Sequence, residues 1–203
     1  MKNKLLLALA LLCVSVLPAL AQAEFAIGIK AGPNFANINT DASAGENYKS
    51  RTGFHGGAFA LVKLTKIGIQ PEVIFSQQGS TVSFNNEDLH ANYSYLNIPI
   101  IVKLYLAAGL NLQVGPQFGF VTKADQEFVD DLGNISKENI KDEMKKSDIS
   151  AALGAGWDLP FGLTIDARYN LGLSKLYDGD GAPEAKNQVF QLSLGYKLFK
   201  FGK

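Results

Sequence analysis

The chain has 203 residues, and its 19 lysines and arginines balance its 19 aspartates and glutamates, so the formal net charge is zero. This balance argues against a nucleic-acid partner, and the length fits a single domain. The single cysteine, Cys13, lies in an N-terminal leader, which leaves the rest of the chain without disulfide or thiol chemistry.

The first 23 residues have the pattern of a secretory signal peptide. Lys2 and Lys4 give a positive start, and residues 5–17 form an apolar run. Two small-x-small motifs follow and predict cleavage before Gln22 or before Glu24. We therefore expect residues 1–23 to be a signal peptide and residues 24–203 to form the exported domain.

Two other interpretations of the leader are weaker. A retained membrane anchor is disfavoured because the apolar run is short for a spanning helix and ends at Pro18. A lipoprotein would be processed at Cys13, but that processing needs a small residue before the cysteine, and Leu12 stands there.

Eight segments after the leader alternate apolar and polar residues with a period of two, which is the period of β-strands. In chain order they cover residues 25–35, 54–64, 67–77, 93–105, 110–120, 149–157, 163–171 and 190–198. One face of each segment is mostly Ile, Leu, Val and Phe, and the other is rich in Gly, Ser, Asn and Gln. No segment after the leader is apolar for 18 residues without interruption, so we expect no membrane-spanning helix there.

The connections between these segments alternate in length. Those after the second, fourth and sixth segments are a few residues long, whereas the others are long and polar. Short turns at one end and long loops at the other are typical of bacterial outer-membrane barrels, whose termini lie at the periplasmic end. The sequence therefore predicts an all-β fold, an eight-stranded antiparallel up-and-down transmembrane β-barrel in contact with outer-membrane lipid.

Alternation alone does not decide which face points outward. A soluble periplasmic barrel that binds a lipophilic ligand would put the apolar face inside. The polar face here is poor in Lys and Glu, which suits a crowded interior better than a water-facing surface. Four aromatic residues of the apolar face also fit an interfacial girdle: Phe120, Trp157, Tyr169 and Tyr196.

Four prolines fall inside the expected strands: Pro33, Pro71, Pro99 and Pro116. Proline has no N–H group for the hydrogen-bond ladder and usually marks a sheet edge or a bulge. Because a closed barrel has no edge, we expect bulges or local twists at these positions.

Several segments resemble a known family. They are GIKAGPNF at 28–35, QPEVIFSQQG at 70–79, YLNIPI at 95–100, NLQVGPQF at 111–118 and DARYNLG at 166–172. Together they are similar to the PorT-like outer-membrane β-barrel family of Bacteroidetes. The resemblance implies a small, porin-family-like barrel of eight strands in the outer membrane. The family's namesake is linked to protein secretion, but most members have no assigned role.

Charged residues on the polar face are the best candidates for a specific site. They are Lys30, Glu72, Lys103, Asp166, Arg168 and Lys197. An eight-stranded barrel is only wide enough for its own side chains, and unpaired charges inside it are costly. We expect a salt-bridge network that plugs the lumen, and the alternative is a narrow conduction path or proton relay.

Counting back across the turn at 160–162 gives a local prediction about this network. It places Arg168 opposite Gly154 and Asp166 opposite Gly156, where glycine leaves room for a large neighbour. We also expect Arg168 and Glu72 to belong to one inner network.

Enzymatic and metal-binding signals are weak. The two histidines, His55 and His90, lie near the top of the second strand and in a loop, and the acidic residue closest to His90 is Asp88. Residues 177–182 resemble the start of a calcium loop, but Ala182 occupies a position that needs Asp or Asn. We therefore expect no catalytic residues, no cofactor and no metal at these sites.

The longest connection, residues 122–147, is densely charged with both signs. Ser136 could cap a short helix that runs to about Lys146. Long loops on rigid scaffolds often carry function, so a protein partner could bind here. We expect a structural or interaction role, through the loops or in secretion, with a plugged lumen. A narrow porin-like channel for small solutes is the main alternative.

Overall fold

The computed structural model describes residues 23–39, 47–84, 87–129, 135–140, 147–174 and 186–202, so residues 1–22 of the predicted leader lie outside it. The strands are β1 Ala23–Asn39, β2 Asn47–Leu64, β3 Ile67–Phe84, β4 Glu87–Tyr105, β5 Leu110–Val129, β6 Ile135–Asn139, β7 Ser147–Asp158, β8 Leu163–Gly172 and β9 Lys186–Gly202. No helix in this part of the chain has the length and apolar character needed to cross a membrane.

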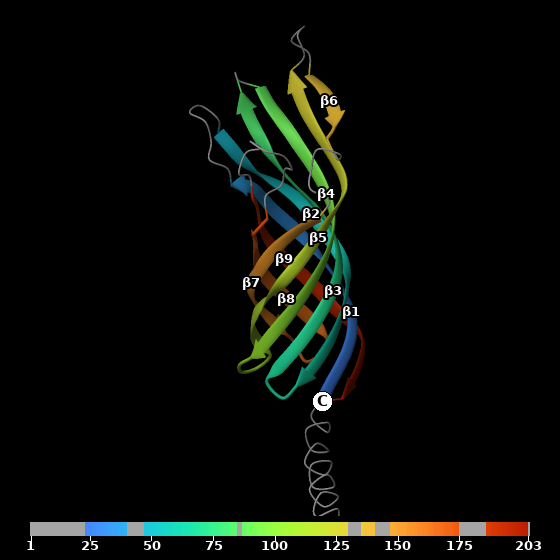
Figure 1. Ribbon diagram of the computed structural model, residues 1–203. Coiled ribbons are helices and arrows are strands. Elements are labelled where there is room, and N and C mark those ends of the chain that lie inside the picture. The colour runs from blue at the N-terminus through green and yellow to red at the C-terminus, as the bar shows by residue number, and fades with distance from the viewer. Residues whose placement is uncertain are drawn as a thin grey trace, which may run out of the picture.

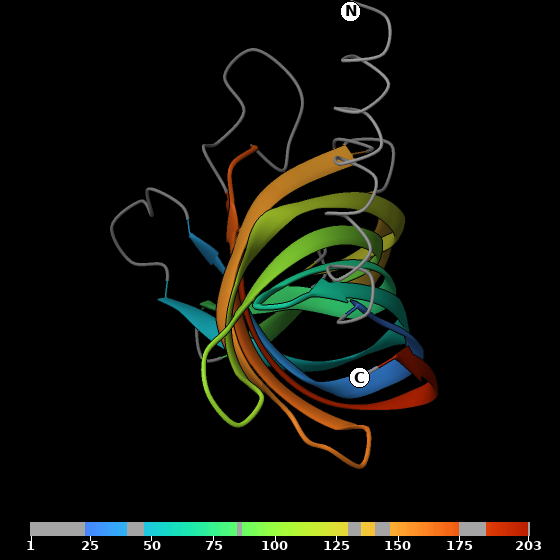
Figure 2. The same ribbon diagram turned by 90° about the horizontal axis from the view of Figure 1, so that it is seen from below.

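The strands form one closed ring. Their order is β4-β3-β2-β1-β9-β8-β7-β5, every neighbouring pair is antiparallel, and a β4–β5 pairing closes the ring. Figure 2 shows this ring from one end. The remaining strand, β6, pairs only with the upper part of β5. The predicted eight-stranded up-and-down barrel is therefore confirmed.

One end of the barrel carries the short connections. They are residues 65–66, 106–109 and 159–162, and the start of β1 and the end of β9 lie at the same end, at the bottom of Figure 1. In bacterial outer-membrane barrels this is the periplasmic end. The short-turn pattern expected from the sequence is therefore present.

The two faces of the wall differ in chemistry. Inward positions carry buried Asn, Gln, Ser, Lys and acidic side chains, whereas outward positions carry large apolar side chains that are 36–65% exposed. Such an apolar exterior would be unstable in water and suits a bilayer. The alternative of a soluble barrel with an apolar interior is therefore wrong.

Three strands continue beyond the apolar belt. Among the side chains that the structure describes, the last large apolar residues on the outer face of β3, β4 and β5 are Phe75, Leu96 and Phe120. The outer face then turns polar with Gln77, Ser94 and Thr122, and the Thr122 hydroxyl donates a hydrogen bond to the Ser94 carbonyl at 2.9 Å. The upper ends of β3, β4 and β5 reach furthest from the short-turn end among the barrel strands, as Figure 1 shows.

The sequence predicted a short helix beginning at Ser136, and this prediction is wrong for the first residues of that segment. Residues 135–139 instead form β6, which pairs with β5 from Val129↔Ile135 to Asp125↔Asn139. Because β7 pairs with β5 only up to Phe120, the upper edge of β5 is open to this second partner. Residues 141–146, the rest of the expected helix, lie outside the described part of the chain.

The expectation of bulges at the prolines is wrong, and its alternative, local twists at these positions, stays a prediction. The register shifts lie at Ile27/Gly28, Ser50/His55 and Ser94/Tyr95, and none falls at a proline. Instead, the β3–β4 ladder stops after Pro71↔Ile100 and resumes at Ile74↔Asn97 in unchanged register. The β2–β3 ladder also lacks a pairing for Gln70 and Pro71, between Phe59↔Glu72 and Val62↔Ile69, again in unchanged register. Because proline has no N–H donor, the pairing is interrupted near it while the strand keeps its register.

Candidate functional site

All six charged residues singled out from the sequence point into the barrel and are buried: Lys30, Glu72, Lys103, Asp166, Arg168 and Lys197. They come from β1, β3, β4, β8 and β9, because the period of two places one residue in every pair on the inner face. They lie in two connected layers, one across the middle of the lumen and one near the short-turn end.

The middle layer is built around Glu72 and Arg168. Arg168 donates two hydrogen bonds to the Glu72 carboxylate, from Nη1 to Oε2 at 3.0 Å and from Nη2 to Oε1 at 2.9 Å. The Gln70 amide also donates to Glu72 Oε1, at 2.8 Å. This two-pronged geometry is the strong form of the arginine–carboxylate contact.

Asp166 is the second carboxylate of the middle layer. Its Oδ2 accepts a hydrogen bond from Lys30 Nζ at 2.8 Å, and its Oδ1 lies 3.6 Å from Lys103 Nζ. Lys30 Nζ also lies 3.5 Å from Glu72, so one lysine links both carboxylates. Gln113 connects the same groups, since its amide nitrogen donates to Asp166 and its oxygen accepts from Arg168.

The layer near the short-turn end contains Lys197. Its ammonium lies 2.6 Å from Glu24 and 3.1 Å from Asp158, and Asp158 also accepts from Lys103 at 3.2 Å and from the Tyr105 hydroxyl at 2.8 Å. Sequence reasoning missed Glu24 and Asp158. Both follow the inward parity of their strands, but the first predicted strand began one residue after Glu24 and the sixth ended one residue before Asp158.

A neutral polar layer contains His55, which is buried. Its Nδ1–H donates to Asn34 Oδ1 at 2.7 Å, and its Nε2 accepts the Ser193 hydroxyl at 2.8 Å. This order resembles a Ser–His–Asn triad. Asn34, however, also bonds Ser76 and Gln191, so the group is part of the packed lumen, and the cavity above it includes neither His55 nor Ser193. The side chains of His90 and Asp88 lie outside the described residues.

Among the described residues, no group of three or more His, Cys, Asp and Glu side chains is arranged to hold a metal ion. The segment at 177–182, which resembles a calcium loop, lies outside the described part of the chain.

The sequence of this chain matches the family model "Outer membrane protein beta-barrel domain" over residues 20–178. The chain belongs to this family. It is a small outer-membrane β-barrel protein. No curated protein matches the sequence significantly.

Solved structures share the fold at low sequence identity. Ail, the attachment invasion locus protein of Yersinia pestis, in complex with the heparin analogue sucrose octasulfate, is 16% identical. That match covers 89% of this chain and 99% of Ail, with a TM-score of 0.52. Neisserial surface protein A is 10% identical over 85% of this chain and 97% of its own, with a TM-score of 0.54. At these identities the likeness concerns the fold alone.

Proposed function

We propose that this protein is a sealed outer-membrane barrel with a structural or interaction role, and that its long-loop end is the part that meets partners. The contact between Glu72 and Arg168 carries this proposal. β3 and β8 lie four strands apart in either direction around the ring, so this pair crosses the full width of the lumen. The ion pairs of Lys103 and Lys197 form a second obstacle below it.

The extended strands support an interaction role at the long-loop end. β3, β4 and β5 continue as paired sheet past Phe75, Leu96 and Phe120, and β6 adds a strand beside the upper part of β5. A rigid sheet that leaves the membrane supports the loops that follow it, and loops on rigid scaffolds commonly bind partners. Ail has been crystallised with a sulfated heparin analogue, so a barrel of this fold can bind a ligand.

Three finer statements belong to the same proposal. Residues 1–23 act as a cleaved signal peptide, which the charged start and the small-x-small motifs support. The five segments quoted above support a PorT-like barrel of Bacteroidetes. That resemblance makes a secretion-associated role one form of the interaction function, alongside surface display.

Two measurements test the proposal. Outer-membrane fractions run on a gel should show faster migration without boiling, as a compact, detergent-resistant barrel does. The purified protein should then give no steady current in a planar bilayer. A steady current from the unaltered protein would overturn the sealed-barrel proposal and favour the narrow porin-like channel.

A further inference from the structure

A pocket of about 420 Å³ opens at the short-turn end of the barrel, the end from which Figure 2 is seen. Its lining has a basic side and an apolar side, which come from different strands. The basic side includes Lys63 of β2 and Lys197 and Lys200 of β9. The apolar side includes Trp157 of β7 and the two residues that follow this strand, Leu159 and Pro160.

Lys200 reaches this pocket because β9 contains one extra residue. Leu198 has no partner on β1, although the residues on either side of it pair with two consecutive residues of that strand. The bulge shifts the parity of β9, so that Lys200 lies opposite Ala26, which occupies a buried inward position. Without the bulge, Lys200 would share the outward side with Leu198. Bulges often re-aim a side chain beside a functional site.

The basic side carries more positive charge than its carboxylates pair. Glu24 accepts a hydrogen bond from Lys197 at 2.6 Å, and Asp158, the other carboxylate of the lining, lies 3.1 Å from the same lysine. Lys63 and Lys200 lie 4.0 and 3.9 Å from one oxygen of Glu24, which is too far for a hydrogen bond. Among the described residues, no other carboxylate comes within ion-pair distance of either lysine. Two neighbouring ammonium groups are therefore able to bind a further anion.

Both lysines are placed where a ligand can reach them. The Lys63 ammonium nitrogen lies 4.2 Å from the centre of the Tyr105 ring, a cation–π contact that holds it over the pocket. The side chains of Lys63 and Lys200 are 25% and 37% exposed. They are thus accessible from the end of the barrel that faces the periplasm.

The apolar side lies close to the membrane interface. Trp157 is on the outer face near the short-turn end, where aromatic residues of membrane barrels meet the lipid head groups. Its indole nitrogen donates a hydrogen bond to the Ala108 carbonyl at 2.9 Å, which fixes the ring beside the pocket. A ligand with an anionic group and an apolar part would match both sides of the lining.

We propose that this pocket binds a phosphate group, with Lys63 and Lys200 as its ligands and the Trp157 side against the remainder of a phosphate ester. Lysine binds phosphate as a point charge, and two neighbouring ammonium groups suit a group with several anionic oxygens. Two sources share this chemistry: the head group of a phospholipid in the periplasmic leaflet, and a soluble phosphate compound. The site lies at the opposite end of the barrel from the long loops, so it does not depend on what they bind.

Trp157 is the only tryptophan of the chain, so the fluorescence of the purified barrel reports on this pocket. In a neutral detergent without phosphate, inorganic phosphate or monomeric dihexanoyl phosphatidylglycerol should change the emission and saturate. Lys63→Gln and Lys200→Gln should each weaken binding by about fivefold or more, because each removes a charged hydrogen-bond donor. Lys66→Gln is the matched control. It removes the same charge from the exposed turn beside the pocket, and salt screening should keep its effect within about twofold.

The two probes distinguish the sources. Tighter binding of the lipid would support the membrane head group as the ligand, and tighter binding of inorganic phosphate would support a soluble phosphate compound. The phosphorus NMR line width of each probe measures the same binding without the tryptophan, and migration of unboiled samples on a gel shows that every variant is folded. Absence of binding by both methods would overturn the proposal. Equal affinities in the three lysine variants, or an equal response to KCl at the same ionic strength, would also overturn it.

Discussion

Arg168 and Glu72 lie on strands directly opposite each other in the ring, are separated by 96 residues in sequence, and meet through two hydrogen bonds. The contact is therefore a brace across the barrel and not a contact between paired strands. Desolvation of both charges opposes such a pair, but the fork geometry and the added hydrogen bonds from Gln70 and Lys30 to the carboxylate offset that cost. The brace explains how a lumen lined with charges can be stable.

Replacing Glu72 by Gln should destabilise the barrel by about 3–5 kcal/mol, because Arg168 would keep its buried charge and lose the one carboxylate within ion-pair distance among the described residues. Urea-induced unfolding in lipid vesicles measures this change. Glu138→Gln is the matched control, since Glu138 is exposed on β6. A Glu72→Gln barrel as stable as the control would contradict a bracing role for the pair.

Replacing Ile100 by Arg should cost about 2–4 kcal/mol, because Ile100 lies on the outer face midway between Leu96 and Leu104, the ends of the apolar stretch of β4, and an arginine there would meet the centre of the bilayer. Ser94→Arg on the same strand should cost only about 0–1 kcal/mol, since Ser94 follows the last apolar residue of the belt. The same vesicle unfolding assay compares the two. Similar costs at both positions would contradict a membrane boundary between Ile100 and Ser94.

The sequence allowed the barrel, its strand count and the orientation of its faces to be predicted, because a period of two is a local property that survives any tertiary arrangement. It also gave the local register, since the β7–β8 turn is short: Arg168 faces Gly154 and Asp166 faces Gly156, as counted. Strand lengths were underestimated. β4 and β5 continue past the alternating segments, and their upper parts are defined by pairing with neighbouring strands: β4 with β3 and β5, and β5 with β4 and β6.

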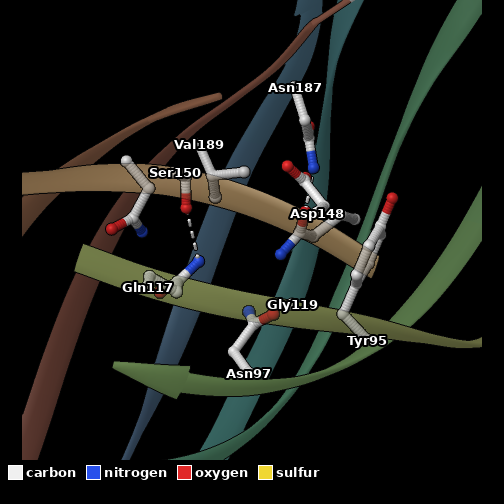
Figure 3. Close-up of a pocket in the computed structure, with 10 residues that line it drawn as sticks. Tyr95, Asn97, Gln117, Gly119, Asp148, Ser150, Asn187 and Val189 are labelled. Carbon is white, nitrogen blue, oxygen red and sulfur yellow. Dashed lines mark hydrogen bonds between the residues drawn. The ribbon is translucent and has the colours of Figure 1, made fainter. Parts of the chain in front are cut away.

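The contacts of the lumen were less accessible to sequence reasoning. Parity identifies which side chains point inward, but the choice of partner depends on the tilt of the strands, which brings β3 and β8 to the same height. Glu24 and Asp158, which bind Lys197, were missed for a simpler reason, because the predicted strands stopped one residue short of them. His55, which the sequence placed near the top of the second strand, is buried. A small cavity in the lumen, lined by Asp148, Asn187 and Asn97 among others (Figure 3), has no sequence signal, because its lining residues come from six separate strands.

Replacing Gly156 by Ala should destabilise the barrel by about 1–3 kcal/mol, which is the usual effect of overpacking. A Cβ at Gly156 would overlap the Gln113 amide nitrogen and the Asp166 carboxylate, which bond each other. Gly56→Ala is the control, because its Cβ would meet Ala31 at an ordinary 3.7 Å. If both variants unfold at the same urea concentration, the glycine is not required for close packing around Asp166.

Replacing Glu24 by Gln should cost less than replacing Glu72, about 1–2 kcal/mol, although both carboxylates are buried. The difference lies in the partners. Lys197 loses its contact with Glu24 at 2.6 Å but keeps Asp158 at 3.1 Å, so no cation is left alone in the lumen. The other neighbours of Glu24, Lys63 and Lys200, are partly exposed and can turn to water.

Removing Asp158 as well, in Glu24→Gln with Asp158→Asn, should cost clearly more than the sum of the single changes, because Lys197 then keeps neither of these two carboxylates. Strict additivity in the urea assay would show that the two carboxylates do not share the lysine.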